Sequence, residues 1–275
     1  MILTFTNSKG DTFDLLSNGL RVKDGNFHSY RWVPQVVTGL LGDSVKGFGK
    51  ESLHYETTLA FKGTENERRD ALNAFHAATE TDIINATPGT LKWQQDYVQC
   101  YVISSSTYPS DETPSWTLND IDIYVPYPFW MRDVKKSFGG NASASETGLD
   151  YPYDYPYQYY QGATGSDIVA TGHYAPSDFT LIIYGPVVDP VISADGHEYG
   201  VYTTIESGEY VTIDSRAHTV MLTENDGSQT NLFDMRTKTQ SVFDKMPGGT
   251  FTVTWPGTYG FDLILHEERS EPEWI

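Results

Sequence analysis

The chain has 275 residues, of which 39% are hydrophobic and 14% aromatic, and its formal net charge is −19. This length is typical of two domains, and the aromatic share supplies enough apolar area for a core in each. The acidic balance argues against a protein that reads duplex DNA or binds an anionic membrane, because both require concentrated lysine and arginine. No stretch of about 18 apolar residues is present, so no membrane span is expected.

The opening residues 1–7 lack the charged region, apolar core and cleavage site of a secretory signal. The single cysteine, Cys100, cannot form an internal disulfide. We therefore expect synthesis in a reducing cytoplasm. Because Cys100 lies in an apolar strand pattern, it is interpreted as a buried and inert thiol.

Alternation of apolar and polar residues predicts a first hairpin, in which Leu3 and Phe5 face Phe13 and Leu15. Further strands are expected within residues 20–38 and 52–62, which are rich in Val, Tyr, Leu and Thr.

Residues 39–50 contain four glycines and predict a flexible loop or the tip of a long hairpin. Their exposed apolar side chains would be costly on an isolated monomer, so we expect a neighbouring molecule to cover them. The candidate oligomer-contact residues of this loop are Leu40, Leu41, Val45 and Phe48.

Residues 64–79 interrupt the β pattern and predict an amphipathic helix. Thr64 and Glu67 have the spacing of a capping box, which satisfies the first free amides of a helix. Apolar residues recur at helical spacing and would pack on a sheet. These residues are Ala71, Leu72, Phe75 and Ala78. No catalytic role is expected for His76 on this helix.

Two more strands are expected at residues 97–103 and 115–125, and residues 126–131 close the first domain. Residues 139–149 are small and polar, the composition of a linker or a mobile loop. Residues 1–133 hold 11 basic and 17 acidic residues, net −6, whereas residues 134–275 hold 7 and 20, net −13. We therefore predict one domain over residues 1–135 and a second over residues 136–275.

The second domain opens with a Tyr/Pro run, residues 151–160, interpreted as an extended segment because each residue before proline avoids the helical region. A platform that stacks on sugar rings is the alternative. Short strand-like runs with Gly, Asp and Asn turns follow and predict a sandwich or barrel. The runs are 179–184, 199–205, 209–214, 217–223, 250–255 and 259–265, and Asp226-Gly227 is a hairpin signal.

Nucleotide-binding, zinc-protease and hydrolase motifs are absent from the sequence. Ser215 and His218 are three residues apart, but this spacing in consecutive strands rarely aims both groups at one point. Oxygen-rich residues 189–196 and 225–227 do not fit a calcium loop and are better explained as turns. We predict no catalytic residue, no metal ligand and no cofactor.

The ordered succession of short motifs resembles the distal tail proteins (Dit) of long-tailed, non-contractile bacteriophages and related prophages. The first half contributes 61–63 (FKG), the helix, and 87–91 (TPGTL) followed by 97–102 (YVQCYV). The second half contributes 151–157 (YPYDYPY), 180–186 (TLIIYGP), 189–192 (DPVI), 207–215 (SGEYVTIDS), 231–234 (NLFD), and Phe243 before 247–248 (PG). The resemblance therefore covers nearly the whole chain.

This resemblance implies a mainly β fold. It comprises an N-terminal ring-forming β domain with one helix and a C-terminal galectin-like β-sandwich. It implies a non-enzymatic protein of the phage tail tip, made in the bacterial cytoplasm, that forms a homo-hexameric ring. The ring would connect the tail tube protein to a tail-tip hub or tail-associated lysin protein and to a receptor-binding protein. DNA would pass in transit, and a channel lined by carboxylates would repel it and let it slide.

Two other classes of function stay open at this point. A carbohydrate-binding β-sandwich module would attach to host-surface glycans. A glycoside hydrolase would need two converging carboxylates, and the abundance of acidic residues does not single out a pair.

Overall fold

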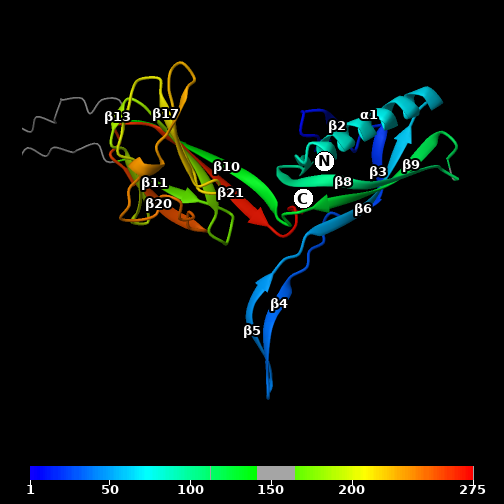
Figure 1. Cartoon of the computed structure of the whole chain (residues 1–275), viewed down its shortest axis with the longest axis horizontal. Helices are drawn as coiled ribbons and strands as arrows, with labels where there is room; N and C mark the ends of the chain where they lie inside the picture. Colours follow the sequence, from blue (N-terminus) through cyan, green and yellow to red (C-terminus); the bar gives the residue numbers. More distant parts are fainter. Residues whose placement is uncertain (112, 141–164, 275) are drawn as a thin grey trace, which may run out of the picture. The chain divides into compact units, whose positions relative to one another are not determined.

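The computed structural model describes residues 1–111, 113–140 and 165–274 (Figure 1). The Tyr/Pro run 151–160 and linker residues 141–149 lie outside the described residues. The chain divides into two compact units. Unit 1 comprises Met1–Arg132 and Glu268–Ile275, and unit 2 comprises Asp133–Glu267.

Unit 1 is built from antiparallel strands and one long helix. Its elements are β1 (Leu3–Thr6), β2 (Thr12–Asp14), β3 (Leu20–Gly25), β4 (Val33–Gly39), β5 (Gly42–Gly49), β6 (Leu53–Lys62), α1 (Glu65–Ile84), β7 (Gly89–Trp93), β8 (Asp96–Pro109), β9 (Trp116–Val125) and the start of β10 (Trp130–Phe138). β1 pairs with β2, with Phe5 opposite Phe13, so the predicted first hairpin is confirmed.

The long strand β8 belongs to two sheets of unit 1. One part pairs with β7, which continues through β1 to β2, and the other pairs with β9, which continues through β6 to β3. The register shifts between Val102 and Ser104, where a bulge bends the strand. Side chains of both sheets meet α1 in one core, in which the Phe75 ring lies 5.3 Å from that of Phe13 and 6.1 Å from that of Phe61.

Helix α1 begins as the sequence predicts and extends five residues further. Thr64 accepts a hydrogen bond from the Glu67 amide and its own amide donates to the Glu67 carboxylate at 2.7 Å, which completes the capping box. These bonds from Thr64 lower the pKa of Glu67. Phe75 and Ala78 are buried against the sheets, and Ala71 and Leu72 pack against the same core, so the predicted apolar face is confirmed.

Unit 2 is a β-sandwich. Its elements are the rest of β10, β11 (Gly165–Ala170), β12 (Asp178–Tyr184), β13 (Val187–Val188), β14 (Val191–Ala194), β15 (His197–Gly200), β16 (Thr204–Ile205), β17 (Tyr210–Asp214), β18 (Thr219–Thr223), β19 (Gln229–Asn231), the 3-10 turn η1 (Phe233–Met235), β20 (Thr250–Trp255) and most of β21 (Phe261–Arg269). One sheet has the order β19-β18-β17-β12-β21-β10, and the other has the order β11-β20-β14-β15.

Alternate residues of both sheets in unit 2 point into a single core, as expected for a sandwich. Leu181 of β12 and Ile213 of β17 represent the first sheet, and Val253 of β20 and Ile192 of β14 the second. All four are buried. The predicted mainly β fold with one α-helix is therefore confirmed for the described residues.

Two strand predictions in unit 2 have different outcomes. The turn at Asp226-Gly227 does join a hairpin, β18 to β19, and Gly227 has the positive φ of 84° that this turn requires. The predicted strand 199–205 is instead two strands, β15 and β16. The chain breaks there because Val201 forms a bridge to Arg236 rather than continuing the ladder.

The C-terminal residues return to unit 1 and are held by a buried ion pair. Arg132 pairs with Asp96, and the amide of Glu273 donates a hydrogen bond to the same carboxylate at 2.7 Å. The Trp274 ring stacks on His28 with ring centroids 3.9 Å apart. The sequence-based division placed residues 268–275 in the second domain. That division, as a statement about independently folding domains, stays a prediction.

Candidate interaction surface

Strands β4 and β5 form a hairpin arm, residues 33–49, that pairs with no other strand among the described residues. Its register runs from Val33 opposite Gly49 to Gly39 opposite Gly42. Most of its side chains are exposed. For residues 39–50 the sequence predicted either a flexible loop or the tip of a long hairpin, and the structure has the hairpin. Figure 1 shows it as a separate two-stranded ribbon.

A β-bulge gathers apolar side chains on one face of the arm. Val45 and Phe48 are three residues apart, so in a regular strand they would point to opposite faces. The register shift between Gln35 and Val36 changes this, because Val36 pairs with Val45 and Pro34 pairs with Phe48. Cross-strand partners share a face, so all four apolar residues line the same side.

The opposite face of the arm carries the exposed side chain of Val37, and the facing strand contributes Ser44, Gly47 and Gly49. A β-carbon built on Gly47 or Gly49 would meet only the side chain of Gln35, at 3.7 and 3.5 Å. The arm therefore has one face of four apolar residues and a sparser face on which Val33 and Val37 alternate with Gln35.

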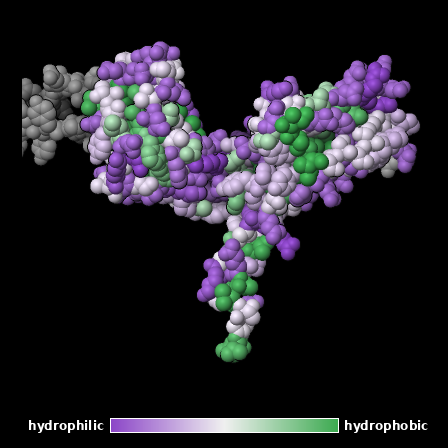
Figure 2. Space-filling model, viewed as in Figure 1, coloured by the Kyte–Doolittle hydropathy of each residue, from purple (hydrophilic) through white to green (hydrophobic). Residues whose placement is uncertain are grey.

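The tip of the arm consists of Leu40 and Leu41, which lie between the paired residues Gly39 and Gly42. Both leucine side chains are fully exposed, at 106% and 104%. Figure 2 shows apolar surface at the end of the arm. The four residues predicted to contact a neighbour thus lie on one arm, at its tip and on its apolar face, and their role in oligomer contact stays a prediction.

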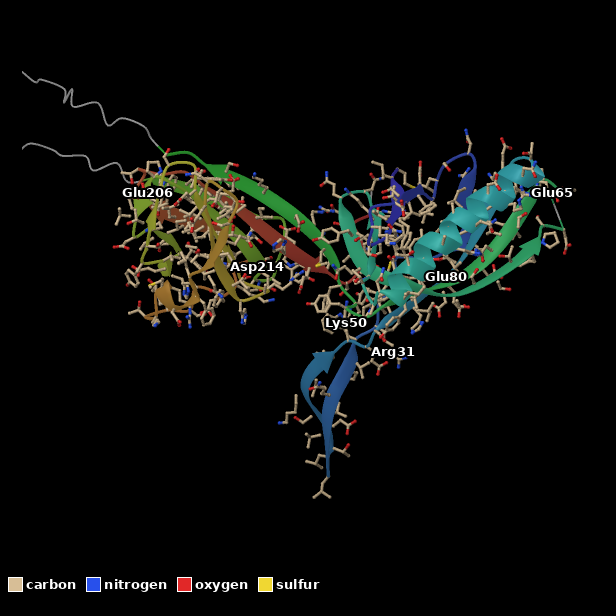
Figure 3. All side chains as sticks on the ribbon, turned by 45° about the horizontal axis from the view of Figure 1, so that its top comes forward. Arg31, Lys50, Glu65, Glu80, Glu206 and Asp214 are labelled. Carbon is tan, nitrogen blue, oxygen red and sulfur yellow. The ribbon has the colours of Figure 1, made fainter. Side chains whose placement is uncertain are left out.

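At the base of the arm a lysine lies among three aromatic rings, which the sequence alone did not reveal. The Lys50 ammonium is 4.2 Å from the ring centroid of Phe129, 4.9 Å from that of Trp32 and 5.6 Å from that of Tyr30. It also donates a hydrogen bond to the carbonyl oxygen of Pro128 at 3.0 Å. Figure 3 labels Arg31 and Lys50 beside this junction. We call Lys50 and the three rings the basal cage.

Burial lowers the pKa of Lys50 to about 8, and the negative charge of Glu268 opposes that shift. The ring faces also favour the charged form. The basal cage joins the segments that enter and leave the hairpin to the loop before β10. It therefore fixes the base of an arm whose two strands, among the described residues, pair only with each other.

A second surface of unit 1 is rich in carboxylates. On the solvent side of β6 and β9, Glu56 lies directly opposite Asp122, and Asp120 is on the same face. Thr58 donates a hydrogen bond to Asp120 at 2.6 Å, and His54 Nδ1 lies 3.0 Å from the Asp122 carboxylate. Like charges directly opposite each other destabilise a sheet. We call Glu56, Asp120 and Asp122 the acidic face.

The structure does not bring Ser215 and His218 together as nucleophile and base. Ser215 is buried, accepts a hydrogen bond from the Phe179 amide at 2.7 Å and donates one to Asp178 at 3.1 Å. The His218 ring instead stacks on Phe243 at 5.0 Å. These contacts give both residues structural roles.

Cys100 and His76 are also held by structural contacts. Cys100 is fully buried, and burial raises the pKa of its thiol to about 12, which confirms the expected buried thiol. His76 Nε2 lies 2.9 Å from Ser105 Oγ and 3.1 Å from Asn119 Nδ2.

Turn geometry accounts for the two oxygen-rich segments. Asp195 and Gly196 both have positive φ and join β14 to β15, and the Asp195 carboxylate accepts a hydrogen bond from the Thr252 amide. Asp226 accepts one from the Ser228 amide within its own turn. Within the described ranges, no group of three or more metal-binding side chains comes together, and no helix is long and apolar enough to cross a membrane.

Comparison of the sequence with family models and with curated proteins gives no match. Comparison of the structure gives several. The Dit protein of phage SPP1, described as a paradigm of the hub adsorption apparatus in phages that infect Gram-positive hosts, has a TM-score of 0.63 at 10% identity. That match covers 98% of this chain and 100% of the SPP1 chain.

Two chains from the phage p2 baseplate in its activated conformation, one solved with calcium and one with strontium, match equally fully. Their TM-scores are 0.61 and 0.62 at 10% and 12% identity, covering 99% of this chain and 100% of each of theirs. At such identities the likeness establishes the fold. The resemblance to Dit proteins is thereby confirmed at the level of the fold.

Proposed function

We propose that this chain is a structural protein of a bacteriophage tail tip, a distal tail protein that connects the tail tube to the host-adsorption apparatus. The observation that carries the proposal is the end-to-end match to SPP1 Dit and to chains of the p2 baseplate, which leaves almost no part of either chain unmatched. Under this proposal the role is structural and needs no catalytic residue.

The proposed assembly is a ring of six copies. A ring requires a heterologous interface, in which one surface of each copy binds a different surface of the next. The arm supports such an interface because its apolar face and its leucine tip are exposed on the single chain. Isolated soluble proteins rarely expose a continuous apolar surface without a binding role.

The acidic face is our candidate for the lining of the DNA channel in that ring. Glu56 and Asp122 lie directly opposite each other, an arrangement of like charges that disfavours strand pairing, which supports a role beyond folding. Carboxylates facing the channel would repel the phosphate backbone, so DNA would slide rather than bind. Determination of the assembled ring tests this assignment, and a basic channel surface would refute it.

Light scattering combined with negative-stain microscopy tests the proposed function. We expect ring-shaped particles of the purified chain, or of the chain mixed with its tail tube protein. We also expect an antibody against the chain to label the distal end of the tail on intact virions. A strict monomer in both preparations, with no labelling of virions, would overturn the proposal. Binding to a glycan array by such a monomer would favour the carbohydrate-binding alternative.

A further inference from the structure

A groove in unit 1 lies between the β2–β3 turn and the first turns of α1. Its volume is about 600 Å³. Apolar side chains of Phe13, Leu20 and Ala71 contribute to its walls. Charged residues Asp14, Lys62 and Glu67 also line it.

The tip of the arm has the chemistry that this groove can bind. Leu40 and Leu41 present two branched apolar side chains that no other described residue of the chain covers. A cavity of about 150 Å³ with apolar walls already holds a benzene molecule, so the groove has room for both leucines. Covering a leucine side chain with apolar atoms contributes roughly 1.5–3 kcal/mol.

We propose that the Leu40-Leu41 tip of one copy docks into the groove beside α1 of a second copy. This inference rests on the proposed function, because it names the surface that receives the arm in the ring. The tip and the groove are different surfaces of the same chain, so the contact is heterologous and can repeat from copy to copy.

Charge supports a second copy as the occupant. Asp43 and Lys46 are exposed on the arm just behind the tip. The groove offers Lys62 to the first and Asp14 or Glu67 to the second. Opposite charges at the edge of an apolar contact fix its register more than they increase its affinity.

Disulfide trapping between two different variants tests the docking. The only native cysteine, Cys100, is buried, so in each variant the introduced cysteine is the thiol that can form a cross-link. Leu41→Cys places a thiol on the tip, and Asn18→Cys places one on the exposed turn that lines the groove. The matched control is Ser106→Cys, an exposed position of unit 1 on β8, away from the groove.

The variants are mixed in pairs at a concentration where light scattering shows self-assembly, and cross-linked dimers are measured after mild oxidation. We expect L41C with N18C to cross-link at least tenfold faster than L41C with S106C or L41C alone. Equal rates, or a preference for tip-to-tip dimers, would overturn the proposed docking without contradicting the proposed ring. Absence of any assembly, alone or with tail tube protein, would instead reject the proposed function.

Discussion

Arg132 donates two hydrogen bonds to the carboxylate of Asp96, from Nε at 2.7 Å and from Nη2 at 3.0 Å. The Asp96 side chain is only 2% exposed, and its bonds raise the pKa of the Arg132 guanidinium above its ordinary value. The third Arg132 nitrogen, Nη1, pairs with Glu273 at 2.6 Å. One buried pair thus anchors the C-terminal residues to unit 1.

Replacement of Asp96 by asparagine should destabilise unit 1 by roughly 3 kcal/mol, because it leaves the Arg132 charge partly buried without its main partner. Urea unfolding followed by tryptophan fluorescence measures this, since five of the six tryptophans lie in unit 1. Asp70→Asn is the matched control. Its pair with Arg69 is exposed at 3.5 Å, so the change should be below about 0.5 kcal/mol. Equal effects would contradict the anchoring role of Asp96.

Lowering the pH should destabilise the folded chain, because His28 must then take up a proton. Burial lowers the pKa of His28, although the charge of Glu271 opposes this, so the folded chain binds fewer protons than the unfolded chain below about pH 6.5. The stability present at pH 7.5 is therefore lost as pH falls through that value. His28→Phe keeps an aromatic ring for Trp274 but does not titrate. The urea midpoint of wild type should drop more than that of H28F between pH 7.5 and 5.5, and parallel drops would refute the assignment.

Replacement of both tip leucines by serine should abolish self-assembly without unfolding the chain. Each exposed leucine contributes roughly 1.5–3 kcal/mol when a partner covers it, so association should weaken by roughly 100-fold or more. Concentration-dependent light scattering measures the loss, and circular dichroism checks the fold. Ile168→Ser changes an exposed apolar residue of unit 2 and should leave assembly unchanged. If the double variant still assembled at the concentrations at which the wild-type chain assembles, the leucine tip would not be an assembly contact.

Lys50→Gln should loosen the base of the arm. Loss of the ammonium removes its attraction to three rings, which together contribute about 1–2 kcal/mol at a partly buried site. At pH 7, where Lys50 is protonated, cleavage of the arm by thermolysin should accelerate roughly fivefold or more. Lys46→Gln alters an exposed lysine of the same arm and, at a concentration too low for self-assembly, should not change the rate. If the two variants are cut equally fast, the basal cage does not hold the arm.

Local chemistry explains why several elements could be predicted from the sequence. Thr64 and Glu67 contact each other within one helical turn, so the start of α1 depends on four residues alone. Asp226-Gly227 similarly determines the β18–β19 turn through backbone preference. Asp195-Gly196 has the same signal and joins β14 to β15, which shows that its hairpin was also predictable.

Elements that depend on distant partners were not predicted. Strand β10 continues to Phe138 through Lys135 and Lys136, which have the composition of a solvated segment. Lys135 pairs with Asp262 at 2.7 Å, more than a hundred residues away in the chain. No local pattern encodes such a contact.

Part of the candidate interaction surface could also be predicted from the sequence, and part could not. Glycine content and exposed apolar residues were sufficient to single out Leu40, Leu41, Val45 and Phe48. The bulge opposite Gln35 depends on strand register, and the basal cage depends on Phe129, far along the chain from Lys50. Both required the folded structure.

The return of residues 268–275 to unit 1 has a consequence for biosynthesis. A ribosome makes the chain from its N-terminus, and domains generally fold as units while they emerge. Unit 1 cannot acquire Glu273 beside Arg132 until all of unit 2 has been translated. A polypeptide truncated anywhere within unit 2 therefore keeps its arm but lacks the final anchor, so incomplete products are the less stable ones and the more accessible to host proteases.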